Sequence, residues 1–435
     1  MHLSTWPRKA LTLAHMWWPR ALACAWFPLL YLITLTPTPT WRRPGPEPFM
    51  FCLLCGDRGG ADLVLNVAMF VPLGLLAARR FGLARTVVLG FSLSLGIELV
   101  QLNLPGRFST FADILANTGG AALGATIYGV GSTLARGSLF PRSAGVAAAI
   151  FSGSLVFLGG WLVEPSPTKA VYWGQWTPSF GPGTRYPGEV LAAELNGRPF
   201  PSWRFPEALN DPSLFLADWR LEGKVRKGEA LLGVTSVLSV FDTNQDEILY
   251  VGAFREHLLL RERLRAQDWG LDRPELVAWD LLDAIQVGDT MRVVVQRTGS
   301  ERCLSVDDRA VCGVGFTPSS LWGLLLYPAS APRWMRAVAG LGVMVLLFFP
   351  TGFLARSWRE VTSYGAVTAA LMAAAIAVTR LGFEPLFEVS GAVAGLVAGY
   401  AAATGLRWAG DRLLTGPESD VSATSAPGYP GSGRS

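Results

Sequence analysis

The sequence predicts an α-helical membrane protein with an inserted, extracytoplasmic all-β domain of the jelly-roll type. Half of its 435 residues are hydrophobic, only 16% are charged, and the mean hydropathy is +0.33. A helix that spans a bilayer needs about 20 mostly apolar residues. Eight segments meet or approach this length, at about residues 21–36, 62–78, 86–102, 112–130, 143–163, 336–354, 362–379 and 387–406. Between the fifth and sixth segments, short alternating runs replace the long apolar ones.

Positive residues predict the orientation of these segments, because Lys and Arg are enriched in cytoplasmic loops. If every segment crosses the membrane, five clusters fall on one side. These clusters are Arg8, Lys9 and Arg20; Arg79, Arg80 and Arg85; Arg136 and Arg142; Arg356 and Arg359; and Arg407 and Arg412. Both termini are therefore expected in the cytoplasm and residues 164–334 outside it. The net charge of +4 reflects this orientation, and no nucleic-acid partner is expected.

Two similar motifs predict that the membrane part is duplicated. Phe70-x-Pro72-x-Gly74 is matched by Phe348-x-Pro350-x-Gly352, and both motifs lie in apolar segments followed by arginine. We expect two four-helix units in the same orientation, an arrangement known from other membrane proteins. The first unit covers residues 1–140. The second opens with a helix at 141–163 and ends with three helices at 335–410, and a disordered cytoplasmic tail is expected at 411–435.

The β domain is expected at residues 164–334 as a sandwich of short strands. Seven runs of apolar and β-branched residues are predicted to be strands. They are Val190–Leu195, Leu214–Leu221, Leu231–Phe241, Ile248–Phe254, Glu256–Leu264, Met291–Val295 and Leu321–Tyr327. Few stretches in this region have apolar residues at the spacing expected for a helix.

The cysteines support an oxidising location for this domain. A two-residue turn at Asp307-Asp308 would place Cys303 directly opposite Cys312, at a non-hydrogen-bonded pair where side chains approach most closely. A disulfide between them is therefore expected. Cys52 and Cys55 lie in the first external loop, where they could form a second disulfide or a redox pair.

Seven polar residues are predicted to meet at the outer end of the first unit. They are Asn66, Ser94, Glu98, Gln101, Arg107, Asp113 and Asn117. Ser94, Glu98 and Gln101 share one helix face, and Asp113 and Asn117 share another. A charged group inside a span costs about 2.5–3.5 kcal/mol on insertion scales. The positions that correspond in the second unit are mostly apolar: Met344 for Asn66, Ile376 for Glu98, Thr379 for Gln101, Ala392 for Asn117 and Glu388 for Asp113. Packing alone therefore does not require most of this set.

Four motifs lie within residues 60–130. They are Asn66…Phe70-x-Pro72-x-Gly74, Ser94-x-x-x-Glu98-x-x-Gln101, Pro105-Gly-Arg107 and Asp113-x-x-x-Asn117-x-x-Gly120-x-x-x-Gly124. Together they resemble the VanZ-like family, and the second unit resembles it only as a degenerate copy. The resemblance implies a bacterial inner-membrane protein of the cell envelope, linked to resistance to the glycopeptide teicoplanin. The resemblance implies that Asn66, Glu98, Gln101, Arg107, Asp113 and Asn117 occupy the family's signature positions, but it assigns them no established catalytic roles.

The β region resembles a concanavalin A-like or laminin G-like jelly roll. The resemblance rests on Val237–Asp242, Ile248–Phe254, Leu258–Arg261 and the hairpin at Asp307. It implies binding of an envelope glycan or a protein partner, sometimes with calcium. Asp242, Asn244 and Asp246 could supply oxygen ligands, although a solvated turn is the favoured interpretation of this loop. No other cofactor is expected.

Three functions stay open at this stage. The first is a non-catalytic protein that binds a membrane lipid or lipid-linked glycan at the polar set. The second is an enzyme in which Glu98 acts as base, Asp113 as acid and Arg107 binds a phosphate or carboxylate. The third is a lipid or solute transporter, which is disfavoured because the charged residues gather at one leaflet. The alternative to all three is a polar network that only locks the helices together.

Overall fold

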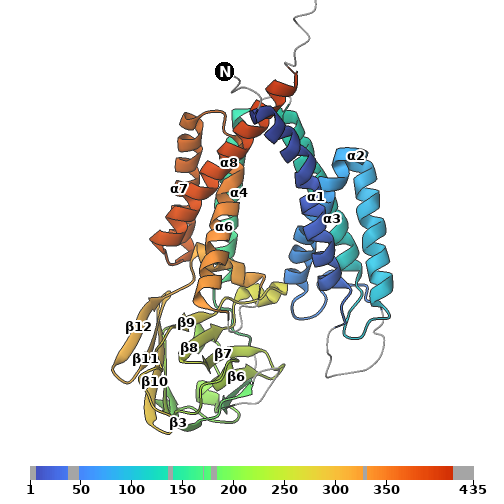
Figure 1. Ribbon diagram of the computed structural model, residues 1–435. Coiled ribbons are helices and arrows are strands. Elements are labelled where there is room, and N and C mark those ends of the chain that lie inside the picture. The colour runs from blue at the N-terminus through green and yellow to red at the C-terminus, as the bar shows by residue number, and fades with distance from the viewer. Residues whose placement is uncertain are drawn as a thin grey trace, which may run out of the picture.

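The computed structural model describes residues 6–37, 49–135, 141–169, 171–177, 184–326 and 331–414. The long helices stand together at one end of the molecule and the β domain lies at the other (Figure 1). These helices are α1 (Trp6–Thr34), α2 (Gly59–Gln101), α3 (Phe111–Ala135), α4 (Arg142–Leu162), α6 (Arg333–Leu354), α7 (Trp358–Thr379) and α8 (Pro385–Leu414). The chain is thus a helical membrane part joined to a sheet-rich part. Most of the predicted tail, from 415 onward, lies outside the described residues, as does Arg136.

Five helices, α2, α4, α6, α7 and α8, are long and apolar enough to cross a membrane, judged by length and composition within the described residues. The 43-residue α2 contains two of the predicted segments, because it turns back on itself at Gly82. Gly82 has φ +73° and ψ 178°, a conformation that essentially only glycine adopts. Figure 1 shows α2 as two arms joined at the end far from the β domain. The count of eight spans stays a prediction.

Glycines bring the helix backbones into contact in both helical groups. In the first group, a Cβ on Gly120 or Gly124 of α3 would lie 2.1 Å from a carbonyl oxygen of α2, that of Val67 or Val71. In the second group, Gly399 of α8 approaches Phe349 of α6 in the same way, at 2.2 Å. Small residues at these crossings are what allows such close approach. The two groups touch each other through α3 and α8.

Two six-stranded sheets form the β domain. One sheet has the order β1-β6-β7-β8-β9 with β2 beside β6, and the other has the order β12-β11-β10-β5-β3-β4. All pairs are antiparallel except β2 with β6. The strands are β1 (Tyr172–Trp176), β2 (Thr184–Arg185), β3 (Glu189–Leu195), β4 (Arg198–Pro199), β5 (Trp219–Arg226), β6 (Thr235–Asp242), β7 (Glu247–Phe254), β8 (His257–Glu262), β9 (Leu276–Ala278), β10 (Thr290–Thr298), β11 (Glu301–Val306) and β12 (Arg309–Val314).

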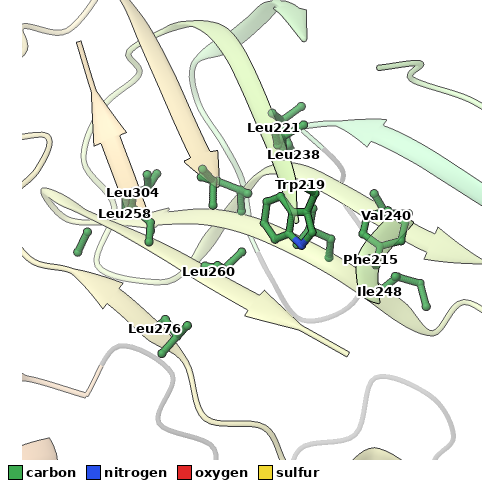
Figure 2. Close-up of a cluster of buried hydrophobic side chains, with 14 of the residues drawn as sticks. Phe215, Trp219, Leu221, Leu238, Val240, Ile248, Leu258, Leu260, Leu276 and Leu304 are labelled. Carbon is green, nitrogen blue, oxygen red and sulfur yellow. The ribbon is translucent and has the colours of Figure 1, made fainter. Parts of the chain in front are cut away.

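The core of this domain lies between the two sheets. Strand β5 alternates, so that Trp219 and Leu221 point inward while Arg220 points to solvent. They meet Leu238 and Leu260 of the facing sheet, as Figure 2 shows. Alternation of this kind is typical of a sheet with one buried face. The arrangement is consistent with a jelly roll.

Two of the predicted strands contain helical turns, and a third, Leu231–Phe241, begins as a strand only at Thr235. Leu321 to Leu324 lie in a 3₁₀ helix, η3 (Pro318–Leu324), because Pro318 and the capping residue Thr317 start a helical turn there. Tyr327 lies outside the described residues. At Leu214–Leu221, the first residues form the single helical turn α5 (Ser213–Leu216), and the strand begins only at Trp219. Asp211 accepts a hydrogen bond from the Ser213 amide at 2.9 Å and so favours the turn.

The predicted disulfide between Cys303 and Cys312 is confirmed. It joins β11 to β12 across the hairpin, whose register pairs Val306 with Arg309 around the turn. Asp307, the first residue of this two-residue turn, has φ +52°, the positive φ that type I′ and type II′ hairpin turns both require there.

Ion pairs attach the β domain to both helical groups. Glu275, which leads into β9, is fully buried and binds Arg261 of β8 and Arg336 of α6, each at 2.7 Å. Arg58, at the start of α2, binds Asp272 at 2.7 Å. The amide of Ala61 also donates to the Gly270 carbonyl at 3.0 Å. These contacts hold the β domain against the starts of α2 and α6, and the start of α2 carries Asn66 of the predicted polar set.

Candidate functional site

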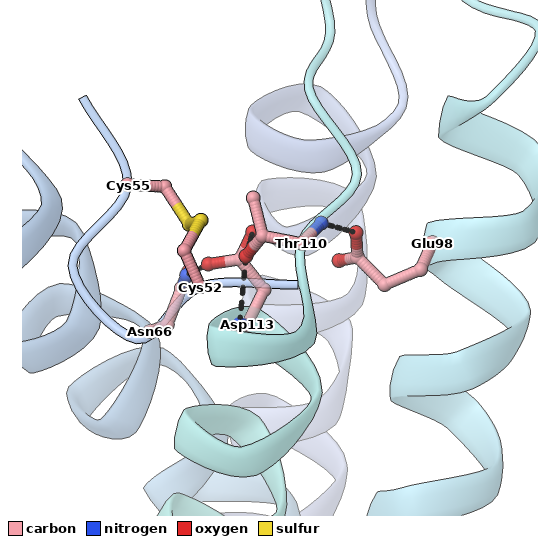
Figure 3. Close-up of a disulfide and its surroundings, with 6 residues drawn as sticks. All are labelled: Cys52, Cys55, Asn66, Glu98, Thr110 and Asp113. Atoms are coloured by element: carbon pink, nitrogen blue, oxygen red, sulfur yellow. Dashed lines mark hydrogen bonds between the residues drawn. A yellow bond between two sulfur atoms is a disulfide. The ribbon is translucent and has the colours of Figure 1, made fainter. Parts of the chain in front are cut away.

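Thr110 joins two carboxylates that come from different helices. It precedes the first residue of α3, and its Oγ1 accepts a hydrogen bond from the Asp113 amide at 3.0 Å. The same hydroxyl donates to Asp113 Oδ2 at 2.8 Å. Its backbone amide donates to Glu98 Oε2, near the end of α2, at 3.0 Å. Figure 3 shows Glu98 and Asp113 on opposite sides of Thr110.

Three further polar side chains complete this group, which we call the polar cluster (Asn66, Ser94, Glu98, Thr110, Asp113 and Asn117). Asn66 Nδ2 donates to Asp113 Oδ1. Asn117 Nδ2 donates to Ser94 Oγ at 2.9 Å, and Ser94 lies 3.5 Å from the Asp113 carbonyl oxygen. The structure therefore brings five of the seven predicted residues together, from both arms of α2 and from α3.

Four members of the polar cluster are buried, whereas Asn66 and Asp113 are half-buried, and the cluster is rich in hydrogen-bond acceptors. Glu98 and Asn117 are each only 2% exposed. In the described part of the chain, Asn117 Oδ1 is buried without a hydrogen-bond partner. Neither Glu98 nor Asp113 forms an ion pair with a described Arg or Lys. A buried carboxylate without a cation has a strong tendency to bind a proton or a donor group.

Gln101 and Arg107 form hydrogen bonds with the end of α1 and are not part of the polar cluster. Gln101 Nε2 donates to the Thr34 carbonyl at 2.8 Å, and Arg107 Nε donates to the Thr36 carbonyl at 2.9 Å. Both side chains thus hold the end of α1 against α2. The structure does not place Arg107 in hydrogen-bond contact with Glu98 or Asp113.

The segment after the undescribed residues 38–48 lies beside the polar cluster. The Met50 amide donates to the Ser109 carbonyl, and the Phe111 amide donates to the Met50 carbonyl, both at 3.0 Å. Cys52 and Cys55 form a disulfide, and a redox role for this pair stays a prediction. The disulfide lies close to Asn66 and Asp113 in Figure 3. The loop that carries Cys52 and Cys55 is therefore attached to the start of α3.

The motifs did not single out Thr110, a member of the polar cluster, or its neighbour Ser109. Ser109 Oγ donates to the Glu98 carbonyl at 2.8 Å. A signal for Thr110 was present, because Thr110-x-x-Asp113 has the spacing of a capping box. In a capping box, the side chain at the third helical position accepts a hydrogen bond from the backbone amide of the capping residue. Here Glu98 binds that amide instead, so the cap of α3 also joins α3 to α2.

The second helical group keeps only one acidic residue at the corresponding place. Glu388, in the first turn of α8, is fully buried. It accepts hydrogen bonds from the amides of Ser319 at 3.1 Å and Glu384 at 2.5 Å. Both of its oxygens therefore have backbone donors, and it fastens η3 to α8. Met344, at the position of Asn66, is buried among apolar side chains.

The weak calcium candidates lie in the tight turn between β6 and β7. Asp242 Oδ1 accepts hydrogen bonds from the amides of Asn244 at 2.8 Å and Asp246 at 2.9 Å. Its Oδ2 accepts one from Thr168 at 2.7 Å. Burial raises the pKa of Asp246, and the nearby Asp242 adds to the effect. In the described ranges, no group of three His, Cys, Asp or Glu side chains could hold a metal ion. Calcium binding here stays a prediction.

Comparison with known proteins identifies one family over part of the chain. No curated protein and no solved structure gave a match. Residues 15–132 match the model of the family described as VanZ/LLP1, and this range contains the whole polar cluster. The match begins well before residue 60, so it includes α1 from residue 15 onward as well as the motifs of α2 and α3. The chain therefore carries a VanZ-like membrane unit at residues 15–132, followed by helices and a β domain that the family model does not cover.

Proposed function

We propose that this protein binds a lipid or a lipid-linked envelope precursor at the polar cluster, as a VanZ-like component of the bacterial inner membrane. The observation that carries this proposal is the unpartnered, buried Asn117 Oδ1 beside two carboxylates without a cation. Such a site suits a ligand that brings hydrogen-bond donors, such as sugar hydroxyls or an ammonium headgroup. A network that only locked helices together would be expected to satisfy its own acceptors, as Glu388 does.

The proposed orientation places the β domain and the polar cluster on the outer side, with both termini in the cytoplasm. Both disulfides lie at the β-domain end, which agrees with an oxidising compartment. Arg142 and Glu360 pair at the opposite end of the helices, as expected for a cytoplasmic surface rich in arginine. We further propose that the β domain is concanavalin A-like or laminin G-like and binds an envelope glycan or a protein partner. The family resemblance suggests a link to teicoplanin resistance.

We also infer that the two helical groups arose by duplication and that only the first kept the site. Equivalent glycines, Gly124 and Gly399, make equivalent backbone contacts in the two groups. The polar side chains of the first group are replaced by Met344, Ile376 and Ala392 in the second. Similar packing with different polarity points to a function in the first group.

An enzyme acting on the same ligand is the second candidate. Glu98 and Asp113 bind the amide and hydroxyl of one residue, Thr110, so both carboxylates lie at the same place. Glu98 is buried and Asp113 is half-buried, and two carboxylates in unlike surroundings are a common arrangement for acid–base catalysis. This candidate differs from binding alone in that a covalent bond of the ligand is broken or formed.

The test compares envelope lipids and lipid-linked glycans by mass spectrometry in cells with the wild-type protein, no protein, or Glu98→Gln. Glutamine can still accept the Thr110 amide, so we expect a normal level of folded protein. We expect the same lipid species to change in the null and Glu98→Gln strains. Glu360→Gln, at the opposite end of the helices, is the control and should match the wild type.

The lipid that co-purifies with each protein separates the two candidates. Binding alone predicts an unmodified lipid that is lost from Glu98→Gln. An enzyme predicts that the substrate accumulates and its product disappears. A Glu98→Gln strain that equals the wild type while the null strain differs would reject the site.

A further inference from the structure

A cavity of about 330 Å³ lies where the β domain meets the ends of α4 and α7. It is separate from the polar cluster, since all of its lining comes from the β domain and the second helical group. Glu164 lines it just beyond α4, and Thr379 and Arg380 line it at the end of α7. Arg297 of β10 and Phe316 close it from the β domain. Its size is within the usual range for small-ligand sites.

Four arginines line this cavity against one carboxylate, that of Glu164. Two of them have carboxylate partners. Arg302 binds the buried Glu262 at 2.5 Å and lies over the Phe316 ring. Arg265 binds Glu164 at 2.7 Å and lies over the Trp161 ring. These two pairs shape the walls and contribute little net charge.

Arg297 and Arg380 have no carboxylate partner among the described residues. Arg297 donates only to backbone carbonyls, those of Phe215 at 3.0 Å and Gly299 at 2.9 Å. Burial lowers the pKa of Arg297, which shows that its charge is poorly solvated. Arg380 caps the end of α7 with φ +55°, a left-handed conformation that few non-glycine residues adopt. The cavity therefore holds uncompensated positive charge.

Apolar side chains stand at the edge of the same cavity. Val378 is 68% exposed and Leu216 is 52% exposed, and both belong to its lining. Val378 lies in the last turn of a helix that is apolar enough to span a membrane. The cavity thus opens at the level where the helices end, beside surface that suits acyl chains better than water.

We propose that this cavity binds the phosphate-bearing headgroup of an anionic lipid in the outer leaflet. Arginine presents planar donors that match phosphate oxygens, and Arg297 and Arg380 are the residues free to do so. The exposed Val378 and Leu216 would contact the acyl chains. The bound lipid would bridge the β domain and α7, which few other contacts join. This site is independent of the polar cluster proposed above.

The test uses the full-length protein, purified in a neutral detergent with both disulfides formed. Retention of phosphatidylglycerol is measured by native mass spectrometry and titration, with phosphatidylcholine and inorganic phosphate as the other probes. The variants are the double change Arg297→Gln with Arg380→Gln, and the single change Arg380→Gly. Glycine suits the left-handed conformation at this position, so Arg380→Gly keeps the fold while removing the guanidinium. Arg226→Gln, an exposed arginine at the far end of β5, is the control.

We expect the wild type and Arg226→Gln to retain phosphatidylglycerol, and Arg380→Gly to bind it about tenfold more weakly, the loss expected for a charge-assisted hydrogen bond. The double variant should lose more. If inorganic phosphate displaces the lipid at equal affinity, the ligand is a free phosphate. If inorganic phosphate does not displace the lipid, the ligand is the phosphate-bearing headgroup of the lipid. Unchanged retention of phosphatidylglycerol by folded Arg380→Gly overturns the proposal.

Discussion

At the scale of single residues, Thr110 explains how two distant carboxylates come together. A capping residue uses its hydroxyl to satisfy an amide in the first turn of its own helix. Thr110 does this for Asp113, and its own amide is taken by Glu98 from α2. One residue therefore starts α3 and also places both candidate catalytic groups. A change at Thr110 should affect the helix and the site together.

We expect Thr110→Ala to lower the free energy of unfolding by about 1 kcal/mol, the usual cost of losing a cap. Thr110→Ser should restore it, because serine keeps the hydroxyl. Thermal unfolding of the purified protein measures this effect. Thr126→Ala, which removes an exposed hydroxyl within the same helix, is the control. Equal stability of Thr110→Ala and the wild type would show that the cap contributes nothing.

At the scale of elements, backbone contact between helices decides which glycines matter. Gly119 and Gly120 are neighbours in α3, yet only Gly120 faces α2. A Cβ on Gly120 would lie 2.1 Å from the Val67 carbonyl oxygen, whereas one on Gly119 would meet nothing within 4 Å. The helices would have to separate to admit the larger side chain. The polar cluster spans this same pair of helices and depends on their spacing.

We expect Gly120→Ala to destabilise the protein by about 1–3 kcal/mol, as overpacking usually does. Gly119→Ala should leave stability unchanged or raise it slightly, because alanine favours helix more than glycine does. Thermal unfolding and the yield of folded protein in detergent provide the comparison. The prediction fails if the two variants behave alike.

At the scale of the whole molecule, ion pairs add to the apolar contacts that join the β domain to the helices. Arg58, at the start of α2, binds Asp272, and Arg336 of α6 binds the buried Glu275. Burial raises the pKa of Asp272, and Arg58 opposes that increase. The ion pair therefore matters most where Asp272 is ionised. This contact also keeps the β domain beside the polar cluster.

We expect Arg58→Gln to destabilise the protein at pH 7 and much less near pH 4. Without Arg58 the pKa of Asp272 in the folded state rises further, while the unfolded value stays near 3.9. The ionised carboxylate is then disfavoured at all pH values above the unfolded pKa, and the penalty fades as pH falls through the folded pKa. Thermal unfolding at both pH values tests this. Arg226→Gln, whose Glu189 partner is exposed, should show no such difference, and an Arg58→Gln deficit that is equal at both pH values would contradict the mechanism.

Hydrophobic pattern and motif spacing were enough to predict the helical part, the sheet-rich insertion and the Cys303–Cys312 disulfide. These features are local, since each follows from periodicity or from a short turn. Five members of the polar cluster were also predicted, because helix spacing puts Glu98 on one face and Asp113 on another. The start of β5 and the helical turn at Leu321 were missed. There, the hydrogen bond that Asp211 accepts from the Ser213 amide and the capping residue Thr317 outweighed the apolar run, which alone does not distinguish strand from helix.

What the sequence by itself determined is the kind of element at each place and the set of polar residues available to a site. Only the tertiary structure decided how they combine. Arg107 binds the Thr36 carbonyl and not the carboxylates, and Thr110 takes the central position. The cavity at Arg297 and Arg380 joins segments more than 80 residues apart, so no local pattern could reveal it. The physical reason is that periodicity reports which face of an element is buried, whereas partners are chosen by packing between elements distant in the chain.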